Sequence, residues 1–205
     1  MKEYYISIED ELKYERSVYA EELHRSDWLF FEENAETFLI HAYRHLLDEP
    51  SYENYILGSY EERTQYNQFY LNLAIGLELL LKSILLKKSV NVNLKNYRTL
   101  QFGNIISEYM EKILPKLSLS TIDEIKTTLM LINEKRNNIA HRSKRSYEHY
   151  ANEYRFSYVT LYIYERYFFK KNDLLTELLL KSISRAKVSS GADYSPLKIK
   201  PKSMR

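Results

Sequence analysis

Between Ser59 and Lys88, apolar residues recur at steps of three and four positions, which is the spacing of one face of an α-helix. The stripe consists of Tyr66, Phe69, Tyr70, Leu73, Leu77, Leu80, Leu81, Ile84 and Leu85. Because so broad an apolar face is unfavourable in water, other parts of the chain must cover it. We therefore predict a long helix at the centre of the fold.

The scarcity of turn-forming residues favours helices in the rest of the chain too. Only four Gly and four Pro occur in 205 residues, which leaves little material for hairpins. Tyr is unusually frequent, with 20 residues, and each ring adds apolar area together with a hydroxyl that needs a polar partner. We predict an all-α fold, a helical bundle in which tyrosines fill partly hydrated helix interfaces.

Hydrophobic periodicity and capping signals divide the remaining sequence into further helices. Their expected extents are residues 4–24, 28–49, 103–114, 120–141, 147–168 and 173–186. Ser26 or Asp27 can cap the second of these, and Ser120-Thr121-Ile122-Asp123 is similar to a capping box. Residues 51–58 are expected to form a connector and residues 89–102 a loop.

The length of 205 residues suits one domain with a tail rather than two substantial domains. We predict a single helical domain over residues 1–186, with its core at about 59–171 and an N-terminal helical extension at 1–58. Residues 187–205 contain Gly, two Pro and five basic residues against a single acid, Asp193. This composition predicts a flexible basic C-terminal tail.

Composition also bears on location and partners. The chain has no Cys, which suits a reducing cytosol, and its first residues are acidic where a signal peptide is apolar. No uncharged apolar run approaches the roughly 18 residues that a membrane span requires. We expect a soluble cytoplasmic protein with no membrane partner. The net charge is only +2, so a nucleic-acid partner would have to be bound by a local basic patch.

A dense polar motif lies at the end of the helix predicted to begin near Ser120, or on its continuation. It reads Arg136-Asn137-Asn138-Ile139-Ala140-His141. If one helix continues through it, Asn137 and His141 share a face, while Arg136 and His141 are separated by about 140° around the axis. Arg136 would then flank the groove formed by that face and reach the same anion with its long side chain.

This motif resembles the signature of the HEPN superfamily of small helical proteins, many of them ribonucleases: Arg, a polar residue, three variable positions and His. The setting is similar as well, because a long helix carrying Leu77-Glu78-Leu79-Leu80-Leu81-Lys82 precedes the motif and another helix follows it. The resemblance covers about residues 59–171. It implies catalytic roles for Arg136 as phosphate clamp, Asn137 as positioning group and His141 as acid or base, with Glu78 and Lys82 in support.

The implied activity is cleavage of RNA without a metal or cofactor, leaving a 2′,3′-cyclic phosphate or 3′-phosphate and a 5′-hydroxyl. His titrates near neutral pH and can transfer either proton, and an Arg fork matches phosphate. The reaction needs two proton transfers, and the resemblance implies a homodimer that places two motifs face to face. It also implies the biology of a toxin or abortive-infection (antiviral defence) protein, restrained by an antitoxin or inhibitory partner.

Basic and aromatic residues just after the motif are candidates for RNA binding by charge and stacking. They are Lys144, Arg145, Tyr147 and His149.

Other interpretations of these residues stay open. Arg136 to His141 can be a solvated last turn whose side chains satisfy terminal carbonyls, and Glu78 with Lys82 an ordinary i,i+4 ion pair. The whole chain can be a non-catalytic HEPN-like module that binds RNA, nucleotide or a protein partner, or a purely structural oligomer.

The pair His41 and His45 has the i,i+4 spacing of metal ligands on a helix. Ala42 occupies the place where a zinc protease has its Glu, however, and no third ligand is evident. We predict no metal site.

Overall fold

The computed structural model describes residues 28–47, 60–88, 101–113, 119–142, 150–168 and 171–190. Within these ranges the chain forms six helices and no strand, which confirms the predicted all-α class. They are the helix of residues 28–47, α3 (Tyr60–Lys87), α5 (Phe102–Lys112), α6 (Leu119–Arg142), α7 (Tyr150–Tyr167) and α8 (Asp173–Ser190).

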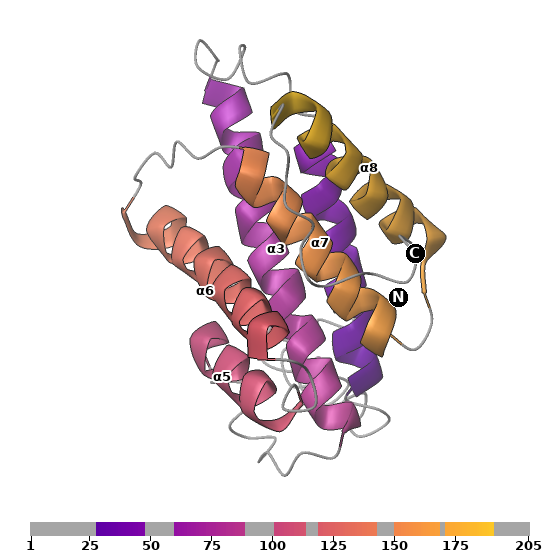
Figure 1. Cartoon of the computed structure of the whole chain (residues 1–205). Coiled ribbons are helices and arrows are strands. Elements are labelled where there is room, and N and C mark those ends of the chain that lie inside the picture. The colour runs from indigo at the N-terminus through magenta and orange to yellow at the C-terminus, as the bar shows by residue number, and fades with distance from the viewer. Residues whose placement is uncertain are drawn as a thin grey trace, which may run out of the picture.

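Helix α3 runs through the middle of the molecule, with α5 and α6 along one side and α7 and α8 on the other (Figure 1). The 28–47 helix, drawn in indigo, lies behind α7. The predicted apolar stripe is buried from Phe69 to Leu85, as its breadth required. Among the described residues, one segment, Asn67–Lys87, is long and apolar enough to cross a membrane by length and composition, and it is mostly buried, at 67%, like the core helix of a soluble protein.

A glycine sets the distance between α3 and the 28–47 helix. A Cβ added at Gly76 would lie 2.8 Å from Leu39 Cγ and 3.1 Å from the Leu39 backbone nitrogen. The two helices therefore approach more closely than any larger residue at position 76 would allow. This contact fixes the 28–47 helix against the centre of the core.

The connection between α7 and α8 is fixed by polar contacts. Asn172 Oδ1 accepts a hydrogen bond from the Leu174 N–H at 2.9 Å, so Asn172 caps α8. The Tyr164 hydroxyl accepts a hydrogen bond from the Asn172 N–H and donates to Glu36 Oε1 at 3.1 Å. The predicted start of the last helix at Asp173 is confirmed, and its cap is the residue before.

Several predicted boundaries differ from the structure. Helix α8 continues to Ser190, so residues 187–190 are helical although they were predicted to begin the tail; the first helix-breaking residue there is Gly191. Helix α6 begins at Leu119, which places Ser120 inside the helix and not at its cap. The predicted helix 4–24, the connector 51–58 and residues 191–205 of the tail lie outside the described residues.

Candidate functional site

Helix α6 positions the motif. It is unbroken from Leu119 to Arg142, because no Gly or Pro interrupts it, and it therefore contains the whole segment from Arg136 to His141. Its inner face, with Ile125, Leu129 and Ile132, is fully buried against the core. The motif thus occupies the helix before its end and is not confined to a frayed last turn.

The outer face of α6 borders a pocket of about 1390 Å³ beside the start of α5. The pocket is lined by Gln101, Phe102, Gly103, Asp123, Lys126, Thr127, Met130, Leu131, Asn133, Glu134, Arg136, Asn137 and Asn138. Arg136 is half-buried at its wall and Asn137 is exposed. The structure therefore brings two of the three predicted catalytic residues to one hollowed surface.

The described polar side chains of the motif have no polar contact with any other described residue. Within the described part of the chain, the side chains of Arg136, Asn137 and Asn138 make no hydrogen bond or ion pair, and neither does that of Asn133, one turn earlier. The Asn side chains thus do not satisfy the last carbonyls of the helix, as they would in a merely solvated terminus. Their donors and acceptors are available to a ligand.

The charge of the pocket is balanced. Two acids, Asp123 and Glu134, face the same hollow as two bases, Lys126 and Arg136. Attraction of an anion must then be local, at Arg136 and at the first turn of α5. There the backbone hydrogen bonds begin with the Asn104 and Ile105 N–H groups, both donating to the Gln101 carbonyl. The preceding amides of the turn have no intrahelical acceptor and favour negative charge.

The remaining predicted site residues fall into two groups. His141 lies on α6, but its side chain is outside the described residues, and so are Lys144, Arg145, Tyr147 and His149.

Glu78 and Lys82 form an i,i+4 ion pair of 2.7 Å on α3. The Lys82 side chain lies 6.0 Å from the centre of the Phe31 ring on the 28–47 helix, and neither residue lines the pocket. The structure does not bring them together with Arg136. Their geometry is that of an ordinary structural pair.

His41 is exposed and His45 is half-buried on the 28–47 helix. Among the described residues, no group of three His, Asp or Glu is placed to hold a metal ion.

The pocket also recruits residues that the sequence did not single out, namely Gln101, Gly103, Lys126 and Asn133. Asn133 stands three and four positions before Arg136 and Asn137, so helical spacing could have found it. Gln101 and Gly103 lie at the start of α5, more than 30 residues before Arg136 in the sequence. Only the packing of α5 on α6 brings them to the site.

Comparison of the chain with protein-family models, with curated proteins and with solved structures found no match in any of the three.

Proposed function

We propose that this chain is a metal-independent endoribonuclease with its site on the outer face of α6. Arg136 binds the scissile phosphate, Asn137 orients it, and His141 transfers a proton during attack of the ribose 2′-hydroxyl. Lys144, Arg145, Tyr147 and His149 extend the RNA contact beyond the end of α6. The HEPN resemblance supplies these roles.

The proposal rests on the position of Arg136 and Asn137 at the pocket and on the absence of a described partner for either side chain. Both project from an unbroken helix into a hollow of about 1390 Å³, and neither is engaged by another described residue. A guanidinium without a carboxylate partner is costly to keep half-buried unless a ligand anion completes it. Gln101, Phe102 and Gly103 at the start of α5 line the same hollow, and a helix N-terminus there adds to the attraction of a phosphate.

The second proton transfer requires a second group near the phosphate. We infer a symmetric homodimer in which His141 of each copy contributes to a composite cleft. An enzyme of this kind would act in the cytoplasm as a toxin or abortive-infection factor, and would need restraint by an antitoxin or another inhibitory protein.

Incubation of the purified protein with total RNA and transfer RNA in EDTA tests the activity. We expect cleavage that leaves 5′-hydroxyl ends, and a loss of about 100-fold or more in His141→Ala and Arg136→Ala. Lys181→Ala is the matched control for loss of a cation, because Lys181 is 62% exposed on α8 and paired only with Glu177. Circular dichroism and light scattering establish that all variants fold and assemble alike. Equal cleavage by Arg136→Ala, His141→Ala and wild type would exclude these residues as the catalytic site.

The balanced charge of the pocket favours one alternative, a non-catalytic module that binds RNA, nucleotide or a protein partner. Two acids beside two bases suit a defined ligand better than a long phosphate backbone. The same RNA experiment separates the two functions. Binding that depends on Arg136, without any cleavage product, would establish the module.

A further inference from the structure

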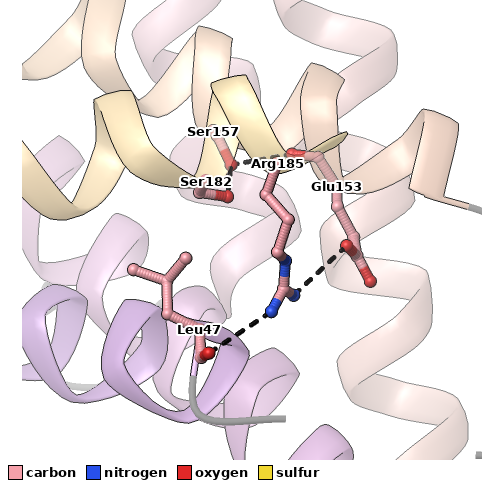
Figure 2. Close-up of polar contacts among 5 residues, drawn as sticks. All are labelled: Leu47, Glu153, Ser157, Ser182 and Arg185. Atoms are coloured by element: carbon pink, nitrogen blue, oxygen red, sulfur yellow. Dashed lines mark hydrogen bonds and ion pairs between the residues drawn. The ribbon is translucent and has the colours of Figure 1, made fainter. Parts of the chain in front are cut away.

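A buried polar cluster lies where α7, α8 and the 28–47 helix meet (Figure 2). Its centre is Glu153 on the first turn of α7, only 5% exposed. Ser157 and Ser182 beside it are also buried, and their hydroxyls are 2.7 Å apart across the α7–α8 interface. An acid at such a position needs strong compensation to remain ionised.

Arg185 of α8 supplies the compensation, and it is divided between two acceptors. One guanidinium nitrogen lies 3.9 Å from Glu153 Oε2, at the outer limit of an ion pair. Another donates to the Leu47 carbonyl at 3.4 Å, on the last described residue of the 28–47 helix (Figure 2). The guanidinium is thus shared between α7 and the 28–47 helix, and its pairing with the carboxylate is weak.

The nearby hydroxyl groups do not stabilise the Glu153 carboxylate either. Ser157 Oγ donates to the backbone carbonyl of Glu153 at 2.8 Å, so this contact does not solvate the carboxylate. Tyr43 Oη and Thr160 Oγ1 are buried without a well-formed hydrogen bond. Among the described residues, the titratable and charged groups that face Glu153 are Arg185 from α8 and Tyr43 from the 28–47 helix, whose own pKa is raised by burial.

Burial therefore outweighs the charge of Arg185, and it raises the pKa of Glu153 to about 7. Neutral and ionised forms coexist at ordinary cellular pH. The ionised form of Glu153 becomes more stable if α8 moves away, because water can then hydrate the carboxylate.

We propose that protonation of Glu153 controls the docking of α8 on α7 and the 28–47 helix. The neutral carboxyl leaves the interface closed, with Arg185 bonded to the Leu47 carbonyl and the two serines joined. Ionisation loosens the half of α8 that contains Ser182 and Arg185, since these residues make the polar contacts across the interface. The device is a proton-sensitive contact between helices, independent of any activity at the pocket.

The raised pKa of Glu153 determines whether opening of α8 increases or decreases with pH. The closed state binds the proton more tightly than an open, hydrated carboxyl with a pKa near 4.5, so opening is least below pH 4.5 and increases as pH rises through about 7. For these two values the opening equilibrium constant grows about tenfold between pH 6 and pH 8.

Hydrogen exchange of the full chain, expressed as protection factors to remove the intrinsic pH effect, measures this opening. We expect amides around Ser182 and Arg185 to lose about tenfold protection from pH 6 to pH 8. Glu153→Gln should make the protection of α8 independent of pH. The matched control is Glu177→Gln, an exposed acid on α8 paired with Lys181, which should keep the wild-type profile.

A carbon-13 NMR titration of the Glu153 side-chain carboxyl in the wild-type protein tests the same proposal without a variant. A midpoint near pH 7 supports it. A midpoint near 4.5, or a pH profile of α8 protection in Glu153→Gln that is unchanged from wild type, would each overturn it.

Discussion

Tyr164 illustrates how single tyrosines are used in this fold. Its ring is fully buried against Phe168, with ring centres 4.4 Å apart, yet its hydroxyl bonds both Glu36 and the Asn172 backbone. One side chain thus fills the core and joins the 28–47 helix to the start of α8. The high Tyr content of the sequence predicted such mixed roles, but it could not identify the partners, which come from residues 128 and 8 positions away.

Replacement of this tyrosine should be costly. Tyr164→Phe removes the hydroxyl while the Asn172 N–H stays at a half-buried site, so we expect a loss of about 1–3 kcal/mol in the free energy of unfolding. Urea denaturation measures it. Tyr162→Phe is the control, since Tyr162 is half-buried and its hydroxyl accepts only from Arg166, an exposed side chain, at 3.4 Å. The idea fails if the two variants lose equal stability.

At the level of helices, periodicity predicted most of the described elements within a few residues. Apolar residues three and four apart specify which face of a helix is buried, and this depends on nearest neighbours in sequence. The pairing of helices is different. Helix α3 packs on the 28–47 helix through a contact between Gly76 and Leu39. The sequence around these two residues does not predict this contact.

Gly76→Ala should destabilise the protein although Ala is the better helix former. The new Cβ would meet both the side chain and the backbone nitrogen of Leu39 at 3.1 Å or less, so the helices must separate, at a cost of about 1–3 kcal/mol. Thermal or denaturant unfolding measures the change. Gly103→Ala provides the contrast, because its Cβ would meet only Asn133 Nδ2 at an ordinary 3.5 Å. We expect Gly103→Ala to be neutral or stabilising by less than about 1 kcal/mol.

For the whole molecule, buried acids should make stability depend on pH. Burial raises the pKa of Glu153 to about 7 and also raises the pKa of Glu36, which accepts a hydrogen bond from the Tyr164 hydroxyl. Both folded pKa values exceed the unfolded value, so the stabilisation from each acid is fully present below about pH 4.5 and is lost as pH rises through its raised pKa, which is about 7 for Glu153.

We therefore expect the contribution of Glu153 to the free energy of unfolding to fall by about 1–2 kcal/mol between pH 6 and pH 8. The difference between wild type and Glu153→Gln, measured by denaturant unfolding at several pH values, isolates this carboxyl from all others. Glu153→Gln should be the more stable protein at pH 8. A difference that does not vary between pH 6 and pH 8 would contradict the expectation.

The assembly state is a second property of the whole molecule. The proposed enzyme requires two copies of His141 at one cleft, so we expect a dimer by size-exclusion chromatography with light scattering. The pocket residue Met130 is 43% exposed and lies on the same face of α6 as Asn137. Met130→Lys should weaken a dimer formed through this face and reduce RNA cleavage in parallel. Wild-type protein that is monomeric and fully active would exclude the composite cleft.

The sequence by itself determined the all-α class and most of the described helices, because these follow from local periodicity and the absence of helix breakers. The sequence left open whether the helix continues through Arg136 and His141, and the structure shows that it does. Tertiary structure decided the rest. It placed Gln101 and Gly103 beside Arg136 and separated Glu78 and Lys82 from the pocket. It also buried Glu153 beside Arg185, whose guanidinium contacts both Glu153 and the Leu47 carbonyl. Such contacts join residues far apart in the chain, so they depend on how the helices pack and not on the pattern within any one of them.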